Sequence, residues 1–177
     1  MQTHTITFCG QAVTIAFAAE FTPVIHRLFS TLKRTDIATP PLFTINHHNN
    51  SGRFSLRRGN TDILESASAG QCAQLLEKSV LQTFIKSFDT GVALLGGAVA
   101  ARPKSVLIPA VSGDGKALLM AWLLANRYRY LGDRLVVWSD EVKALHAFSG
   151  SFKINRRIAP QALPLLGLDN AATELIH

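Results

Sequence analysis

The sequence predicts a mixed α/β protein in which a sheet is flanked by helices, and three observations support this fold class. Short runs rich in β-branched and aromatic residues alternate with turn residues through residues 1–65. A regular helical stripe follows between Ser68 and Phe88. The segment from Val106 to Met120 then has the order strand, small-residue turn and helix, which is typical of phosphate-binding loops.

The first of these regions is expected to contain a hairpin, a helix and a meander. Residues 5–8 and 12–17 read as two strands joined at Gly10. Thr22 and Pro23 mark the start of a helix that must stop before Pro40. Three further strands are predicted at residues 42–45, 53–56 and 61–64. His47 and His48 lie beside the first turn of this meander, and adjacent strand residues point to opposite faces, so a solvated turn is favoured over a metal site.

The helical stripe consists of apolar residues at every fourth position, and we interpret it as core packing. It is formed by Cys72, Leu76, Val80, Phe84 and Phe88. Residues 91–95 and 105–108 are continuous apolar runs, as expected of strands buried on both faces, with a turn at residues 102–104. Cys9 and Cys72 lack metal-ligand spacing and are interpreted as buried apolar residues, and Trp122 and Trp138 as packing residues.

The carboxyl-terminal part is expected to contain a helix over residues 116–126 and strands at 135–138 and 142–145. Beyond Ile158, Pro160 and Pro164 predict loops, and residues 171–177 a short tail or terminal helix. We therefore predict a single domain with three parts. These are an amino-terminal strand and helix layer (1–90), a core built on the phosphate loop (91–158), and a loop and tail (159–177).

The hydrophobic content and the charge of the chain indicate which partners and which cellular location to expect. The 177 residues are 47% hydrophobic, and no apolar tract is long enough to span a bilayer or follows a basic leader, so we expect a cytoplasmic protein without a membrane partner. The 18 basic and 12 acidic residues give a net charge of +6. The cations lie in small scattered groups without a nucleic-acid motif, which favours a protein or peptide partner over nucleic acid.

The phosphate-binding pattern G-x-x-x-x-G-K-[ST] is present only in part. Ser112, Gly113, Gly115 and Lys116 supply most of the loop. Alanine replaces the first glycine at position 110 and the hydroxyl residue at position 117, and that hydroxyl is the usual protein ligand of magnesium. Lys116 is expected at a helix start, where a cation is disfavoured unless an anion is bound, so anion binding is favoured over a relic loop.

Three consecutive segments together resemble the HPr serine kinase-related proteins. They are Gly-Val-Ala-Leu-Leu-Gly-Gly-Ala from Gly91, Val-Leu-Ile-Pro-Ala-Val-Ser-Gly-Asp-Gly-Lys ending at Lys116, and Tyr-Arg-Tyr-Leu-Gly-Asp-Arg-Leu-Val-Val from Tyr128. The resemblance covers residues 91–155. It implies a phosphoenolpyruvate-carboxykinase-like fold with a phosphate loop, and ATP or another nucleotide with Mg²⁺ as the cofactor.

The resemblance also implies roles for single residues. Ser112, Gly113, Gly115 and Lys116 correspond to the residues that hold nucleotide phosphates. The family's acidic pair corresponds to Asp133 and Arg134, so Asp133 is the candidate magnesium ligand or catalytic base. Arg134, Lys153 and Arg156 are candidates for substrate or phosphate contacts. For Arg134 an ion pair with Asp133 or Asp140 is favoured instead, and for Lys153 and Arg156 a solvated basic surface. The family's histidine position corresponds to Gly96.

The hydroxyl, one acidic residue and the histidine are thus lost together. This pattern favours a diverged, non-catalytic or weakly active binding or accessory subunit that retains a phosphate or nucleotide site. Two alternatives stay open. One is an active ATP-dependent serine kinase for a peptide or protein, and the other is a structural or interaction protein that uses no nucleotide.

Overall fold

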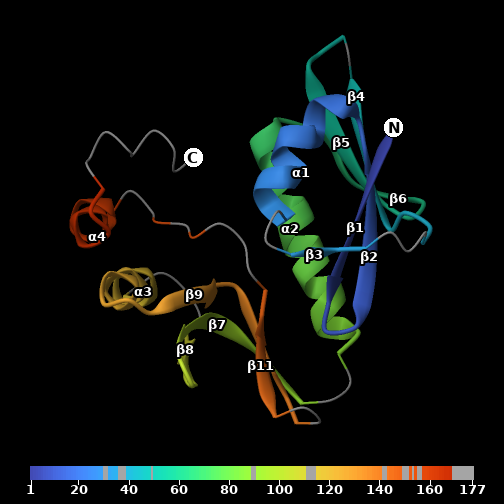
Figure 1. Cartoon of the computed structure of the whole chain (residues 1–177). Helices are drawn as coiled ribbons and strands as arrows, with labels where there is room; N and C mark the ends of the chain where they lie inside the picture. The colour runs from blue at the N-terminus through green and yellow to red at the C-terminus, as the bar shows by residue number, and fades with distance from the viewer. Residues whose placement is uncertain are drawn as a thin grey trace. The chain divides into compact units, whose positions relative to one another are not determined.

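The computed structural model describes residues 1–29, 32–35, 39–48, 50–88, 91–110, 115–140, 143–148, 152, 154 and 157–168. The chain divides into two compact units, Met1–Asp89 and Thr90–His177. Across these residues there are two sheets and four α-helices, so the expected mixed α/β class is confirmed (Figure 1). No helix in the described part of the chain is long and apolar enough to cross a membrane.

The first unit is built on a six-stranded sheet with the order β3-β1-β2-β4-β5-β6. The strands are β1 (Gln2–Phe8), β2 (Gln11–Phe17), β3 (Lys33–Arg34), β4 (Phe43–His48), β5 (Arg53–Arg58) and β6 (Thr61–Ala67). Strands β2 and β4 run parallel and the other pairs antiparallel. Cys9 and Gly10 turn the β1–β2 hairpin with φ values of 49° and 78°, as a two-residue hairpin requires. The predicted hairpin and meander are confirmed.

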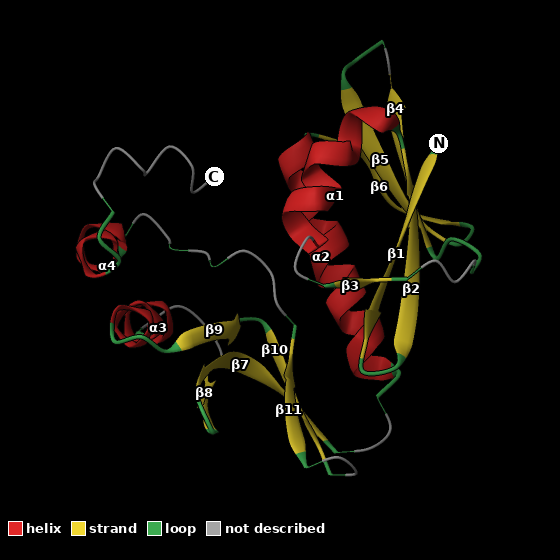
Figure 2. Cartoon of the chain, in the orientation of Figure 1, coloured by secondary structure: helices red, strands yellow, loops and turns green. Residues whose placement is uncertain are grey.

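Two helices cover one face of this sheet (Figure 2). A 3₁₀ turn, η1 (Ala19–Phe21), leads into α1 (Thr22–Phe29), which begins at Thr22 as predicted. Helix α2 (Ala69–Lys86) packs on α1, β5 and β6. Ser68 caps it through a capping box with Gln71. Its predicted stripe is buried from Cys72 to Phe84, and burial raises the pKa of the Cys72 thiol to about 12.

The second unit is built on a five-stranded antiparallel sheet with β7 at its centre. Its strands are β7 (Val92–Ala101), β8 (Lys104–Pro109), β9 (Arg129–Gly132), β10 (Leu135–Ser139) and β11 (Ala144–Ala147). The order is β11-β10-β7-β8. Along one edge β7 pairs with β10 and then with β9, and along the other edge with β8. The sequence did not predict β9, because it is only four residues long and begins with an arginine.

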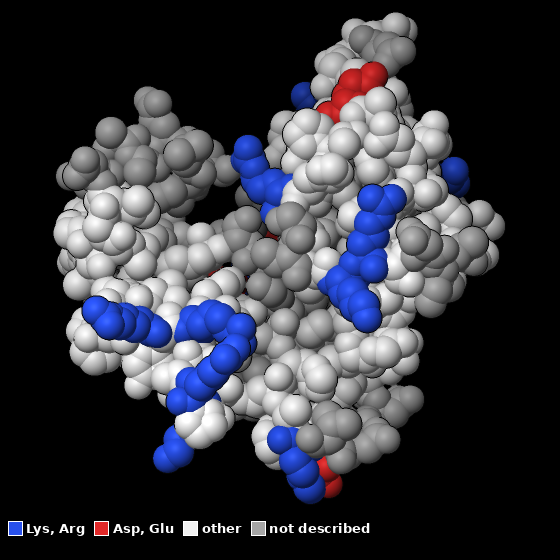
Figure 3. All heavy atoms as spheres, viewed as in Figure 1, with Lys and Arg blue, Asp and Glu red and all other residues white. Residues whose placement is uncertain are grey.

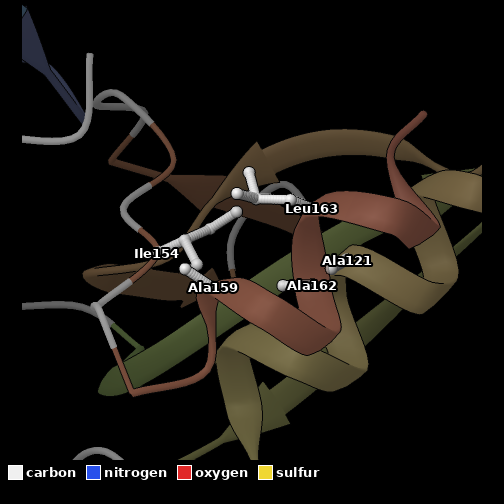
Figure 4. Packing of buried hydrophobic residues seen from close by; sticks show 5 residues of the cluster. All are labelled: Ala121, Ile154, Ala159, Ala162 and Leu163. Carbon is white, nitrogen blue, oxygen red and sulfur yellow. The ribbon is translucent and has the colours of Figure 1, made fainter. Parts of the chain in front are cut away.

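Two helices complete this unit. Helix α3 (Lys116–Ala125) packs on β7, with Met120 and Leu123 against Val99 and Ile108. Helix α4 (Ala159–Leu165) packs on α3 from the other side. Figure 4 shows this contact, which is formed by Ala121, Ile154, Ala159, Ala162 and Leu163. Helix α3 is therefore packed both on the sheet and against a second helix, as the predicted strand, loop and helix order requires.

Three expectations for this unit are wrong. Residues 159–165 form a helix and not a loop, with Pro160 in the first turn, where a proline leaves no helical hydrogen bond unmade, and Pro164 inside the helix. Val92 and Leu95 are 51% and 54% exposed and Val106 is 38% exposed, so neither the run at 91–95 nor the run at 105–108 is buried on both faces. Trp122 is 50% exposed and does not act mainly in packing. The predicted tail, residues 171–177, lies outside the described residues.

Candidate functional site

The predicted site residues fall into two groups. Ser112, Gly113, Lys153 and Arg156 lie outside the described residues. Gly115, Lys116, Asp133 and Arg134 are described and belong to the second unit. The described part of the candidate site therefore consists of the start of α3 and the segment that joins β9 to β10.

Gly115 is the residue at which α3 begins. Its φ of 99° lies in the left-handed region, which glycine adopts without steric cost. A Cβ at this position would meet no atom within 4 Å, so backbone conformation and not space explains the glycine. The Gly115 carbonyl accepts the N–H of Leu119 at 2.8 Å, and among the described residues no side chain caps the helix start. The first turn of α3 thus keeps N–H groups that can face an anion.

Asp133 and Arg134 form the bend between β9 and β10. Both strands pair with β7, through Gly132 with Ala98 and Leu135 with Leu95. The bend therefore lies beside Gly96, whose N–H donates to the Arg134 carbonyl at 3.4 Å. It interrupts the alternation of side chains along the strand, so the direction of the Asp133 side chain cannot be inferred from strand periodicity.

The ammonium group of Lys116 donates a hydrogen bond to the backbone carbonyl of Asp133. This contact joins the start of α3 to the bend, and it is the only hydrogen bond of the ammonium to a described residue. Burial lowers the pKa of Lys116, the Asp133 charge acts in the opposite direction, and the nearby Arg134 lowers it further. A lysine ammonium has three donors, so this one keeps donors for a ligand.

The carboxylate of Asp133 is engaged by its own neighbours. The residue is 6% exposed, and its Oδ1 accepts the Tyr130 hydroxyl at 2.9 Å. The Arg134 Nε lies 3.9 Å from the same oxygen. The ion pair between Arg134 and Asp133, predicted as the alternative to a substrate or phosphate contact of Arg134, is therefore present in the structure. A buried carboxylate with these partners is poorly suited to meet a solvated metal ion or a substrate hydroxyl.

The donor set suits an anion better than Mg²⁺. Magnesium needs oxygen ligands, and Ala117 supplies none where a hydroxyl is usual. Among the described residues, no group of three or more His, Cys, Asp and Glu side chains is placed to hold a metal ion. Lys116 and the start of α3 instead offer positive charge and N–H donors, which bind phosphate oxygens.

Gly96, the position for which the resemblance implies a histidine, has a steric role in the sheet. A Cβ built on Gly96 would lie 2.6 Å from the backbone oxygen of Ile108 and 3.2 Å from the Pro109 Cα. The adjacent Gly97 is crowded by a side chain, the sulfur of Met120, at 2.4 Å from an added Cβ. A larger residue at Gly96 would therefore require the β7–β8 backbone to move.

An apolar groove lies between α3 and α4. Its volume is about 530 Å³, and it is lined by Gly115, Leu118, Leu119, Trp122, Gln161 and Leu165. Leu119 and Trp122 are 45% and 50% exposed. Neither Lys116 nor Asp133 lines the groove, whereas Gly115 belongs both to the groove and to the start of α3.

A polar pocket in the first unit contains His47 and His48. The Nδ1 of His47 lies 3.5 Å from the Glu20 Oε1, and its ring stacks on Phe54 with 4.8 Å between centroids. The acidic neighbour, Glu20, belongs to η1. Because η1 is far from His47 in the sequence, the sequence analysis did not identify this neighbour. His48 is exposed at the turn, in keeping with the solvated turn that was predicted.

Sequence reasoning missed Tyr130 as the partner of Asp133. Residues three apart in a straight strand point to opposite faces, so the contact depends on the bend at Asp133. The signal that could have suggested it is the Tyr-Leu-Gly-Asp sequence, with a flexible glycine before the acid.

Searches of protein-family models, curated proteins and solved structures found no match to the chain.

Proposed function

We propose that this protein is a diverged relative of the HPr serine kinase-related proteins that binds a phosphate group or a nucleotide and acts as a non-catalytic accessory subunit. The observation that carries the proposal is the contrast between its two charged groups. Lys116 keeps ammonium donors beside an uncapped helix start, whereas the carboxylate of Asp133 is buried against Tyr130 and Arg134. The site is therefore equipped to bind an anion and poorly equipped to transfer a phosphoryl group.

A bound phosphate would improve the electrostatics of this region. The partial positive charge at a helix start disfavours a neighbouring cation and favours an anion. Lys116 is also partly desolvated, and this lowers its pKa. An anion with two negative charges offsets both unfavourable effects, which gives the binding a physical driving force.

Phosphoryl transfer needs more than this anion site. Catalysis depends on a metal and cations that neutralise the developing charge, and on a residue that orients the attacking hydroxyl. Asp133 is the only candidate base from the resemblance, and this residue is only 6% exposed. Ala117 and Gly96 stand where the resemblance expects a magnesium-binding hydroxyl and a histidine. The kinase alternative therefore has less support than binding alone.

A thermal-shift titration tests the anion site. ATP, GTP, pyrophosphate and inorganic phosphate are each added with and without Mg²⁺, because a ligand bound only by the native state raises the melting temperature. At least one phosphate compound should raise it, Lys116→Ala should remove the rise, and the exposed helical control Lys78→Ala should keep it. The absence of any shift would favour a structural protein that uses no nucleotide.

A transfer assay separates binding from catalysis. The protein is incubated with radiolabelled ATP, Mg²⁺ and serine-containing peptides, and phosphopeptide and released phosphate are measured. We expect no turnover above that of the Lys116→Ala variant. Turnover that is lost in both Lys116→Ala and Asp133→Asn, while both variants remain folded, would establish the kinase alternative instead.

A further inference from the structure

Strand β8 is a free edge of the sheet in the second unit. It is the last strand in the order β11-β10-β7-β8, and β7 is its only strand partner among the described residues. The residues at its start, Lys104, Ser105 and Val106, are exposed, Val106 by 38%. An exposed edge with β-branched and aliphatic residues is a template on which another strand can pair.

The β7–β8 register shows which backbone groups are available at this edge. The N–H of Ala110 donates to Leu95 at 3.3 Å, and hydrogen-bonded pairs alternate along an antiparallel ladder. The backbone N–H and C=O groups of Val106 and Ile108 therefore form hydrogen bonds with β7, while those of Ser105 and Leu107 point outward from the sheet edge. Pro109 has no N–H, so the edge offers donors over a short stretch only.

A group of cations surrounds the beginning of this edge. Arg102 and Lys104 lie at the β7–β8 turn, and Arg129 of β9 pairs with Ala100, which also pairs with Ser105. Two strand spacings place the Cα atoms of Arg129 and Ser105 about 10 Å apart. Figure 3 shows Lys and Arg atoms grouped over α3, β8 and β9. Within the described residues 91–110 and 115–132 there is no Asp or Glu.

We propose that β8 binds an extended, acidic peptide segment of a partner protein by strand addition. The outward groups of Ser105 and Leu107 supply the backbone hydrogen bonds, and Arg102, Lys104 and Arg129 select acidic side chains. A second copy of the chain is the less suitable occupant because it carries the same cation group and a net charge of +6. This inference does not depend on the phosphate site, and Lys116 takes no part in it.

Fluorescence anisotropy with two labelled octapeptides tests the proposal. Both peptides alternate valine with a charged residue, glutamate in one and lysine in the other. Only the glutamate peptide should bind. Ser105→Pro removes an outward N–H without removing a bond to β7, so it should weaken binding about tenfold, as expected for loss of one or two backbone hydrogen bonds. Ser105→Thr keeps the N–H and should bind like the wild type.

A pair of double variants tests the charges. Arg102→Gln with Lys104→Gln should weaken binding of the glutamate peptide several-fold, whereas Lys78→Gln with Lys86→Gln, two exposed lysines of α2, should not. Equal binding of both peptides, no binding of either, or binding unaffected by Ser105→Pro would overturn the proposal. A dimer in analytical ultracentrifugation that Ser105→Pro dissociates would assign the edge to a second copy. Oligonucleotide binding lost only on charge neutralisation, with no peptide binding, would assign the cations to nucleic acid.

Discussion

The Lys116 ammonium is bonded to the backbone carbonyl of Asp133, and the Asp133 side chain plays no part in that bond. The residue that the resemblance names as a magnesium ligand or catalytic base thus contacts Lys116 through its main chain. Substitution of the Asp133 side chain therefore leaves this contact chemically possible. Substitution of Lys116 removes it, and the two positions can be tested separately.

Lys116→Met should separate stability from anion binding. It removes a hydrogen bond worth about 1 kcal/mol but also relieves the desolvation of a charge, so the free energy of unfolding should change by no more than about 1 kcal/mol. Urea unfolding in phosphate-free buffer measures this change. The thermal shift caused by phosphate compounds should disappear. A stable variant that still shows the wild-type thermal shift with phosphate compounds would contradict the assignment of Lys116 as an anion-binding residue.

Tyr130→Phe should destabilise the second unit by about 2 kcal/mol, because it removes a hydrogen bond to a buried carboxylate. The measurement is urea unfolding followed by circular dichroism. Tyr128→Phe is the matched control, since it deletes the same hydroxyl from a half-buried tyrosine of the same cluster, and it should cost less than about 0.5 kcal/mol. Equal effects of the two substitutions would show that the Tyr130–Asp133 bond contributes little.

Gly96→Ala and Gly97→Ala should differ although the residues are neighbours. At Gly96 the added methyl group meets the backbone of Ile108, so the cost should be about 3 kcal/mol or more. At Gly97 it meets the flexible end of Met120, so the cost should be about 1 kcal/mol. A double-mutant cycle with Met120→Ala should reduce the cost of Gly97→Ala and leave that of Gly96→Ala unchanged. The reverse result would exclude this account of β7.

His4 should make the first unit less stable in mild acid. Its pKa is lowered from 6.5 by burial and by the charges of Arg34 and His26, whose ring centroid lies 6.3 Å away. Because the folded pKa is below the unfolded one, the unfolded state binds the proton first. Stability is therefore fully present above pH 6.5 and falls as the pH decreases below that value.

Urea unfolding between about pH 7 and about pH 5 measures this dependence. His4→Gln should flatten it, because a glutamine does not titrate. The control is His48→Gln, at an exposed histidine of the same unit, and it should leave the dependence unchanged. Identical pH profiles for His4→Gln and the wild type would place the acid sensitivity in another residue.

Elements with a clear local signal were predictable from sequence. The β1–β2 hairpin has its turn residues, α2 has a capping serine and a four-residue repeat, and α3 follows an apolar strand and a glycine. Helix α4 was missed because proline was taken as a loop signal, although its cost is small in the first turn of a helix. The exposure of Val92 and Leu95 could not be predicted, because α3 packs on the later part of β7.

The candidate site was predictable in its residues and not in their contacts. Gly115 and Lys116 lie at a helix start as the phosphate-loop pattern implies. The burial of Asp133 depends on the bend after Gly132 and on the distant pairing of β9 and β10 with β7. These are tertiary relationships between segments far apart in the sequence, and local periodicity carries no information about them.

Strand β7 determines where the second unit can be cut to give a separately expressed fragment. Because β8, β9 and β10 all pair with it, its amides are expected to exchange with deuterium more slowly than those of the edge strands. A separately expressed fragment must therefore begin before Val92. One that begins at Gly97 would lose every pairing with β10, and with it the attachment of β11.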